Sequence, residues 1–281
     1  MASTTPHTHT LNDGTTLPAI GLGTYALRGI PGAEAMADAL REGYRLLDSA
    51  VNYENEGAVG KAVRMSGVKR EEIRITSKLP GRHHKKPNVT WCIEESVQRM
   101  GLDYIDLYLI HWPNPSQKLF VEAWEGMIEA RERGLVRSIG VSNFLPEHLD
   151  ELIAKTGVAP SVNQIELHPY FNQAEQRAAD KARGVLTQAW TPIGKGTALL
   201  AESIIVDIAA KHGRTPAQVV LRWHVQLGVL PIPKSANASR RMENLKVEGF
   251  ELDEADMAAI ATLTRVNGRL FDGDPRTHEE F

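Results

Sequence analysis

The sequence predicts a closed (β/α)8 barrel, an α/β fold in which eight parallel strands alternate with helices. Two observations support this prediction. Short apolar runs rich in β-branched residues recur along the 281-residue chain, and amphipathic stretches of helical period separate them. Strands and helices that alternate at this spacing need parallel crossover connections, and eight such units favour a closed barrel over an open sheet.

The apolar runs are expected to form eight strands, at residues 19–24, 45–49, 73–78, 105–111, 136–142, 162–167, 185–191 and 229–234. Helix candidates lie between them, at residues 33–43, 55–66, 89–100, 119–134, 146–155, 173–183 and 216–227. In the last of these, Trp223 and Leu227 fall on one apolar face. Thr215 supplies an N-cap, and Pro216 follows it at the first helical position.

The segment before the first strand departs from this alternation. Asn12-Asp13-Gly14 is a hairpin turn signal between residues 10–11 and 15–17. We expect a small β-hairpin here that caps the bottom of the barrel, at the N-terminal ends of its strands. Residues 192–213 and 251–281 exceed the simple repeat, but no linker divides the chain. We therefore predict a single domain over residues 1–281, with residues 1–9 disordered.

Composition and charge exclude several classes of protein. Hydrophobic residues make up 42% and charged residues 24%, the balance of a globular chain. With 32 basic and 35 acidic side chains the net charge is −3, so no basic field favours nucleic acid. The single cysteine, Cys92, forbids an internal disulfide. No run approaches the roughly 18 apolar residues of a membrane span, and the start lacks a signal peptide, so we expect a cytoplasmic protein.

Ionisable side chains of four kinds end or closely follow successive strands. Asp48 ends the second strand and Tyr53 lies in the loop after it, while Lys78 and His111 end the third and fourth. Each residue alone has an ordinary explanation as a cap, a packing residue or a solvated charge. A barrel brings the C-terminal ends of its strands to one mouth, where its active sites lie. The convergence of all four groups therefore indicates a catalytic site.

These four groups suit proton donation to a carbonyl oxygen. A tyrosine has a pKa of about 10, and a neighbouring ammonium lowers that pKa by stabilising the phenolate. Lys78 can supply the ammonium, Asp48 can hold Lys78, and His111 can donate a hydrogen bond to the carbonyl oxygen. The set would make Tyr53 a general acid that protonates an alkoxide as hydride adds to a carbonyl carbon.

Two other chemistries have less support. His83 and His84 are adjacent in a basic loop, and the chain contains no HExxH or His-x-His pattern, so we predict no metal site. The chain also lacks the G-x-S-x-G turn that carries the serine of α/β hydrolases.

Longer motifs follow one another along the chain. They are Gly21-Leu22-Gly23-Thr24, Leu47-Asp48-Ser49-Ala50, Thr76-Ser77-Lys78-Leu79, residues 106–113, residues 139–144, residues 163–169 and Ile232-Pro233-Lys234-Ser235. In this order and spacing they resemble the aldo-keto reductases, and the likeness runs from about Leu11 to the tail. Within that family the chain is most similar to the short-looped bacterial members typified by 2,5-diketo-D-gluconic acid reductase.

The resemblance implies a (β/α)8 barrel that uses NADPH to reduce small aldehydes, ketones or keto-sugars to alcohols, with Tyr53 as the proton donor and Asp48, Lys78 and His111 as its partners. For the nicotinamide it implies hydrogen bonds to the carboxamide and an aromatic stacking face. The residues are Ser142, Asn143, Gln164 and Trp190. Trp190 departs mildly from the family, in which many members carry Tyr or Phe.

The resemblance also implies where the phosphates of the cofactor bind. Barrels often bind phosphate after their last strands, and a basic group here favours NADPH over NADH. Its residues are Lys234, Ser235, Asn237, Arg240 and Asn244. The loop over the pyrophosphate would contribute Thr191, Ile193, Gly194 and Lys195. The alternative for the basic group is a solvated helix start, and Arg241 would point elsewhere.

For the substrate, the resemblance places Tyr25, Leu79 and Trp112 along the pocket, with residues 266–281 as a C-terminal tail near it. We expect a monomer whose partner is a small carbonyl compound. The alternative function is an NADPH-binding, redox-sensing regulatory protein with little turnover, as the potassium-channel β subunits of the superfamily are. Turnover of carbonyl compounds would separate the two.

Overall fold

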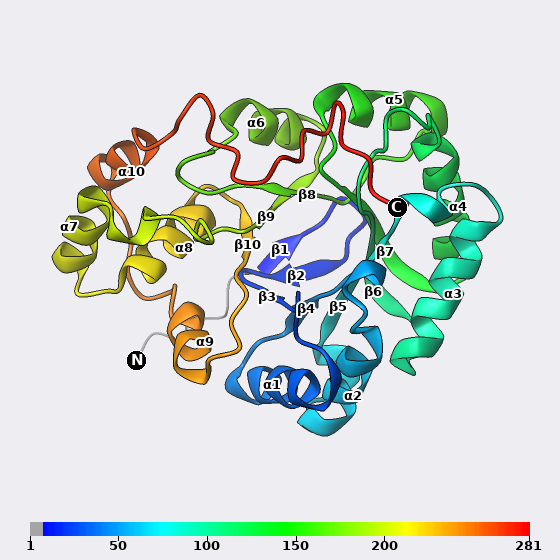
Figure 1. The fold of residues 1–281 in the computed structure, drawn as a ribbon, viewed down its shortest axis with the longest axis horizontal. Helices are drawn as coiled ribbons and strands as arrows, with labels where there is room; N and C mark the ends of the chain where they lie inside the picture. Colours follow the sequence, from blue (N-terminus) through cyan, green and yellow to red (C-terminus); the bar gives the residue numbers. More distant parts are fainter. Residues whose placement is uncertain (1–7) are drawn as a thin grey trace.

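The wall of the barrel is an eight-stranded sheet whose strands follow one another in chain order, all of them parallel. This computed structural model describes residues 8–281. Figure 1 shows the strands as a ring surrounded by helices. They are β3 (Leu22–Gly23), β4 (Leu46–Asp48), β5 (Arg74–Leu79), β6 (Ile105–Ile110), β7 (Val136–Ser142), β8 (Val162–Glu166), β9 (Leu186–Trp190) and β10 (Leu230–Ile232). Each falls within or against a predicted run, so the predicted fold class is confirmed.

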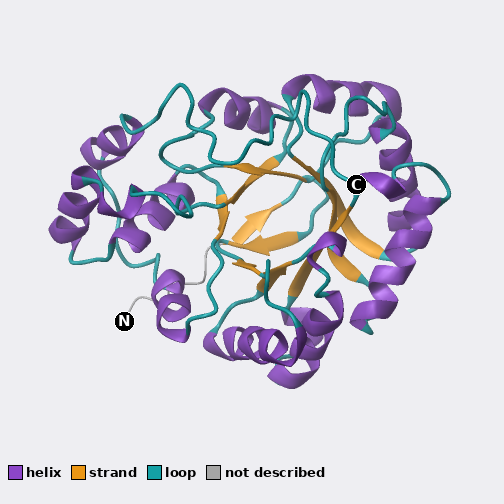
Figure 2. Cartoon of the chain, in the orientation of Figure 1, coloured by secondary structure: helices purple, strands orange, loops and turns teal. Residues whose placement is uncertain are grey.

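Helices form the outer layer of the barrel (Figure 2). Those after the first six strands are α1 (Gly29–Glu42), α2 (Glu56–Ser66), α3 (Asn88–Met100), α4 (Phe120–Glu132), α5 (Pro146–Thr156) and α6 (Ala174–Ala182). Those that follow are α7 (Ser203–His212), α8 (Pro216–Gln226), α9 (Ala238–Leu245) and α10 (Glu254–Ala261). Residues 192–213, which exceed the predicted repeat, contain α7. The predicted cap of α8 is confirmed, because Thr215 Oγ1 accepts a hydrogen bond from the Gln218 amide at 3.3 Å.

Two glycines let the first and last strands close the ring. The amide of Gly21 donates to the carbonyl of Pro231 at 3.1 Å, and that of Gly23 donates to Pro233 at 3.0 Å. A Cβ on Gly21 would lie 2.7 Å from Cδ1 of Ile232, closer than carbon atoms pack. The two glycines of Gly21-Leu22-Gly23 therefore allow the first and last strands to pack closely.

The predicted hairpin covers the N-terminal ends of the strands. It consists of β1 (Thr8–Thr10) and β2 (Thr16–Pro18), which pair antiparallel and lie in the centre of the ring in Figure 1. In its turn, Asp13 Oδ2 accepts hydrogen bonds from the hydroxyls of Ser138 and Ser161 at 2.6 and 2.8 Å. The prediction of disorder for residues 1–9 is wrong at Thr8 and His9, which pair with β2, while residues 1–7 lie outside the described part.

The apolar core has an inner and an outer layer. Inside the ring, Leu17 of the hairpin packs with Leu107, Val162 and Leu230. Outside it, larger clusters fill the space between the strands and the helices. After α10 the chain, coloured red in Figure 1, crosses the mouth of the barrel, and its last residues contact Asn52, Gly81 and Asn114 in the loops after β4, β5 and β6. Among residues 8–281, no helix is long and apolar enough to cross a membrane.

Candidate active site

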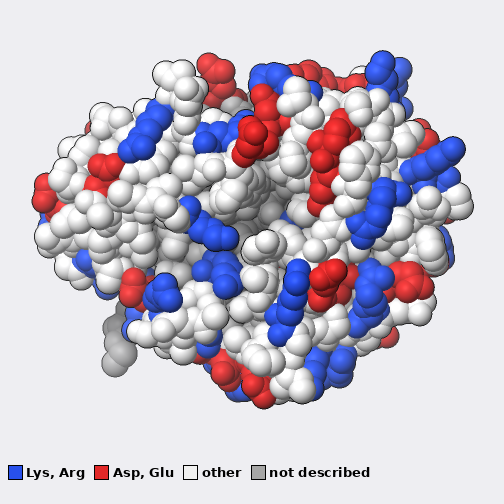
Figure 3. Space-filling model, viewed as in Figure 1, with Lys and Arg blue, Asp and Glu red and all other residues white. Residues whose placement is uncertain are grey.

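A cavity of about 880 Å³ opens at the C-terminal ends of the strands. Figure 3 shows this hollow near the middle of the face, with Lys and Arg side chains on part of its rim. The structure brings most of the predicted site residues together here. Those that line the cavity are Tyr25, Asp48, Tyr53, His111, Trp112, Ser142, Asn143, Gln164, Trp190, Thr191, Ile193, Gly194, Lys195, Lys234 and Arg240.

Asp48, Lys78 and Tyr53 form one chain of polar contacts under the cavity. Lys78 is fully buried, and its Nζ lies 2.6 Å from Oδ1 of Asp48 and 2.8 Å from the carbonyl of Ser49. The same Nζ donates to the Tyr53 hydroxyl at 3.4 Å. The ammonium is therefore held by the last residue of β4 and by the residue after it, and it faces the phenol, as predicted from the strand ends.

Burial and the Lys78 ammonium act on Tyr53 in opposite directions. Burial raises the pKa of the Tyr53 hydroxyl, and the positive charge of Lys78 lowers it only in part, so the pKa lies above its ordinary value. This corrects the expectation that the ammonium would set the direction of the shift. Burial would lower the pKa of Lys78, but Asp48 and Tyr53 together raise it. Tyr53 therefore carries its proton and Lys78 its charge near neutral pH.

His111 stands beside Tyr53 and contacts a residue that the sequence did not single out. The two rings meet edge to face with centroids 5.9 Å apart. On its other side, Nδ1 of His111 lies 2.7 Å from a carboxylate oxygen of Glu280. Glu280 belongs to the tail, whose position depends on tertiary contacts, so no local sequence pattern could have indicated it. Phe271 of the tail, which also lines the cavity, packs against Trp190 with ring centroids 5.5 Å apart.

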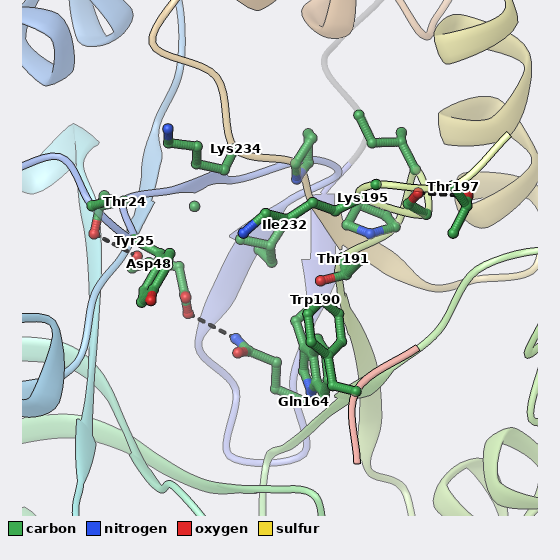
Figure 4. Close-up of a pocket in the computed structure, with 18 of the residues that line it drawn as sticks. Thr24, Tyr25, Asp48, Gln164, Trp190, Thr191, Lys195, Thr197, Ile232 and Lys234 are labelled. Atoms are coloured by element: carbon green, nitrogen blue, oxygen red, sulfur yellow. Dashed lines mark hydrogen bonds between the residues drawn. The ribbon is translucent and has the colours of Figure 1, made fainter. Parts of the chain in front are cut away.

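The residues predicted to bind nicotinamide form a hydrogen-bonded group with the tetrad. Gln164 Nε2 donates to Asp48 Oδ2 at 2.7 Å, a bond drawn in Figure 4, and also to Gln188 Oε1 at 3.0 Å. Trp190 Nε1 donates to Asn143 Oδ1 at 2.9 Å. Because the amide protons of Gln164 are used in this way, its Oε1 is the atom that remains for a ligand.

Strained backbone marks the same region. Ala26, Asn143 and Thr191 line the cavity and have left-handed φ angles of 62°, 63° and 53°. A β-branched residue such as Thr191 rarely adopts this conformation, and such strain clusters at functional sites. The loop that begins at Thr191 also carries Lys195, whose side chain extends toward Tyr25 in Figure 4 and lies 5.4 Å from its ring centroid.

The predicted phosphate group is only partly gathered at the cavity. Lys234 and Arg240 line it, but Ser235, Asn237 and Asn244 are not among the described residues that do so. Asn237 is the N-cap of α9, because its Oδ1 accepts from the Arg240 amide at 3.0 Å. Arg241 does point elsewhere, as expected, and its guanidinium contacts the Glu42 carboxylate at 2.7 and 2.8 Å.

The prediction that Leu79 lines the pocket is also corrected. Its side chain is fully buried in the cluster between the strands and the outer helices, and it is not one of the described residues at the cavity wall. The reason is the alternation of side chains along a strand. Lys78 points into the barrel, so its neighbour Leu79 points out of it.

The predicted absence of a metal site concerns the whole chain and stays a prediction. Within residues 8–281, no three His, Cys, Asp or Glu side chains are placed to hold an ion. His84 is fully buried, and His83 packs edge to face on Trp91.

Comparisons with known proteins agree with this geometry. The profile of the Aldo/keto reductase family matches residues 19–265. 2,5-Diketo-D-gluconic acid reductase B of Corynebacterium sp. (strain SHS752001) is 55% identical over 274 residues, which cover 98% of each chain. Methylglyoxal reductase DkgA of Escherichia coli (strain K12) is 43% identical over 266 residues, covering 94% of this chain and 95% of that protein.

A solved structure shows the same arrangement of the whole fold. The crystal structure of a Gox0644 mutant in complex with NADPH matches this one with a TM-score of 0.93, and the two sequences are 43% identical. The match covers 98% of this chain and 99% of that one. The family match and the near full-length identities confirm the resemblance seen in the motifs. This chain belongs to the aldo/keto reductase family.

Proposed function

We propose that this protein reduces small aldehydes, ketones or keto-sugars to alcohols with NADPH, and that Tyr53 donates the proton. One observation carries the proposal. Tyr53 lines the cavity, and its hydroxyl lies 3.4 Å from the buried Lys78 ammonium, which Asp48 holds at 2.6 Å. This arrangement suits the protonation of a forming alkoxide, because the Tyr53 hydroxyl can give the proton and the Lys78 ammonium can stabilise the negative charge.

The cavity suits a nicotinamide dinucleotide phosphate. Its volume of about 880 Å³ is in the range of small-molecule and cofactor sites. Lys234 and Arg240 lie at one part of the wall, where they would contact phosphate. Trp190 and Gln164 lie beside the tetrad, where an aromatic face and an amide would hold the nicotinamide (Figure 4). When bound, NADPH supplies the hydride that adds to the carbonyl carbon.

Residues of the chain then protonate the substrate oxygen and stabilise the negative charge that develops on it. As the carbon gains its new C–H bond, the C=O electron pair moves to oxygen. The Tyr53 O–H bond breaks and its proton joins that oxygen, which yields the alcohol. Lys78 stabilises the phenolate that remains until solvent returns a proton, and His111 donates a hydrogen bond to the reacting oxygen.

The walls of the pocket favour a small substrate. Aromatic rings of Tyr25, Trp112, Trp190 and Phe271 surround the tetrad, so shape selects substrates more than polar anchors do. The names of two relatives point the same way, because one is a reductase of 2,5-diketo-D-gluconic acid and the other a reductase of methylglyoxal. The structure named above contains NADPH, which supports the choice of cofactor.

Steady-state oxidation of NADPH with methylglyoxal, an aromatic aldehyde and a diketo-sugar acid tests the proposal. Turnover is expected with at least one of them. Tyr53→Phe should lower kcat about 10²- to 10⁴-fold without loss of NADPH binding. Tyr104→Phe is the matched control, because Tyr104 stacks with Arg70 and Arg137 and is not one of the described residues at the cavity.

Full turnover by Tyr53→Phe would refute the role of Tyr53. Tight NADPH binding without turnover of any carbonyl would refute the enzymatic proposal and favour a redox-sensing protein. The monomeric state stays a prediction, which sedimentation equilibrium would test.

A further inference from the structure

Glu280 lies directly behind the histidine of the tetrad. Its Oε1 is 2.7 Å from Nδ1 of His111 and accepts a hydrogen bond from Nδ2 of Asn52 at 2.7 Å. His111 lines the cavity, whereas Glu280 is not one of the described residues that do. The carboxylate therefore contacts the ring from outside the cavity wall. Its side chain is only 16% exposed, so solvent screens this contact little.

Asn114 and Gly81 fix the position of the Glu280 backbone, and with it the direction of the carboxylate. Asn114 is fully buried, and its Nδ2 donates to the carbonyl of Glu280 at 2.6 Å. The amide of Glu280 donates in return to Oδ1 of Asn114 at 3.2 Å. A Cβ on Gly81 would lie 2.1 Å from the Glu280 carbonyl oxygen, so only glycine leaves room for the tail at this point. The contact with His111 is thus specified by two elements besides the pair itself.

The surroundings keep the Glu280 carboxyl ionised. Burial would raise its pKa, but the contact with His111 and the hydrogen bond from Asn52 together lower it. His84 is buried nearby and adds to this effect. Other charged or titratable groups surround the pair. Glu279 and His83 act on His84, and Arg82 donates to Asn52 Oδ1. Glu280 also acts on Tyr53, on which Lys78 and Asp48 act as well.

We propose that Glu280 is a positioning residue that holds a proton on Nδ1 of His111 and fixes the orientation of its ring. This inference rests on the proposed function. A neutral imidazole has a single N–H, so a ring that keeps its proton on Nδ1 has only an acceptor at Nε2. His111 can donate from Nε2 to a carbonyl oxygen only when both nitrogens carry protons. Glu280 therefore makes the donor at the reacting oxygen a cation, which stabilises the forming alkoxide more than a neutral donor does.

A charged donor predicts a characteristic pH dependence. The active form is lost when the His111–Glu280 pair gives up its proton, so kcat should fall on the alkaline side of the profile. Since the two groups are coupled, the midpoint of this limb belongs to the pair. Removal of the carboxylate charge should move that midpoint to lower pH, because nothing then favours the doubly protonated ring.

Glu280→Gln tests this without changing the shape of the side chain or its backbone contacts with Asn114. We expect kcat at neutral pH to fall about 10- to 100-fold, and the alkaline midpoint to drop by about one pH unit or more. The KM for NADPH should stay within about twofold, because Glu280 does not line the cavity. Glu279→Gln is the matched control, since the Glu279 carboxylate accepts from the Ser116 amide instead, and it should keep the wild-type profile.

Nitrogen-15 NMR of the imidazole gives a readout that needs no turnover. In the wild-type protein both His111 nitrogens should show protonated shifts at neutral pH, and in Glu280→Gln one nitrogen should show the shift of an unprotonated acceptor. A Glu280→Gln protein with wild-type kcat, pH profile and imidazole shifts would overturn the inference. If wild-type protein reduces no carbonyl, the proposed function fails instead, and the NMR comparison still decides the role of Glu280.

Discussion

Trp190 and Asn143 are tied together by a hydrogen bond of 2.9 Å from the indole Nε1 to the amide Oδ1. Asn143 Nδ2 in turn donates to the backbone carbonyl of His111 at 3.0 Å. The ends of β6, β7 and β9 are thereby linked through two side chains. The aromatic face expected to stack on nicotinamide, and the amide expected to contact its carboxamide, therefore form one unit.

Trp190→Phe should distinguish the contribution of aromatic stacking from that of the hydrogen bond to Asn143. Phenylalanine keeps an aromatic face but cannot donate to Asn143, and an acceptor left without its partner costs about 1–3 kcal/mol. We expect the Kd for NADPH, measured by fluorescence titration, to rise about tenfold. Trp91→Phe is the control, because Trp91 is 56% exposed and remote from the described cavity wall, and it should bind as the wild type does. An unchanged Kd in Trp190→Phe would show that the hydrogen bond contributes nothing to the cofactor site.

Lys78→Met should affect both catalysis and stability. It removes the charge that faces Tyr53 and leaves Asp48 buried without its cation. Loss of one partner of a buried ion pair lowers the free energy of unfolding by about 3–5 kcal/mol, and we expect kcat to fall at least about 100-fold. Urea denaturation and steady-state kinetics measure the two effects.

The double variant Asp48→Asn/Lys78→Met distinguishes these effects. It removes the unpaired carboxylate, so part of the lost stability should return while kcat stays low. Recovery of kcat together with stability would mean that Lys78 acts only through the fold.

Lys234 and Arg240 should determine the preference for NADPH over NADH. Charge-assisted contacts to phosphate contribute about 1.5–3 kcal/mol each, so Arg240→Ala should raise the KM for NADPH about 10- to 100-fold. The KM for NADH should change less than about twofold, because NADH lacks the 2′-phosphate. Lys61→Ala, on the exposed face of α2, controls for the loss of one positive charge. An equal rise in the KM for NADPH and for NADH would show that Arg240 does not contact the 2′-phosphate.

The sequence predicts the barrel and its tetrad because both follow from local patterns. Strand composition locates the eight runs, and parallel topology then carries Asp48, Lys78 and His111 to one mouth. Leu79 was misplaced although alternation along β5 already separates it from Lys78. Glu280 is different, because its place depends on how the tail passes Gly81, more than 100 residues earlier in the chain. Such contacts depend on packing between distant segments and leave no periodic signal.

Two glycines of α2 should respond in opposite ways to alanine. A Cβ on Gly60 would lie 1.7 Å from the carbonyl oxygen of Met100 in α3, whereas a Cβ on Gly57 would lie 3.5 Å from that of Arg99. Gly60→Ala must push α2 away from α3, so we expect a loss of about 1–3 kcal/mol in the free energy of unfolding. Gly57→Ala makes only an ordinary contact and should gain about 0.5–1 kcal/mol from reduced backbone entropy. Equal stabilities in thermal and urea unfolding would contradict this packing of the two helices.

Acid should destabilise the protein through buried histidines. His224 is fully buried, and its Nδ1 and Nε2 lie 2.8 and 3.1 Å from the carbonyl oxygens of Val220 and Leu167. Burial lowers the pKa of His224 to about 4 in the folded protein. Because the unfolded chain takes up this proton near pH 6.5, the stabilisation is complete above that pH and is lost as the pH falls from about 6.5 to 4.

This shift corresponds to about 2 kcal/mol of unfolding free energy lost between pH 7 and pH 5. In the wild type this loss adds to that of any other buried histidine, so urea denaturation at the two pH values should show a larger difference. His224→Gln should reduce that difference by about 2 kcal/mol, since an amide does not titrate. Burial also lowers the pKa of His84 to about 4, so a similar loss should persist in the variant. His224→Gln/His84→Gln should then lose both contributions and keep the opposite one of Asp180, because burial raises the pKa of that carboxyl to about 6. A single variant with the full wild-type pH dependence would mean that His224 takes up its proton without unfolding, and that the folded protein admits a charge between the two carbonyl oxygens.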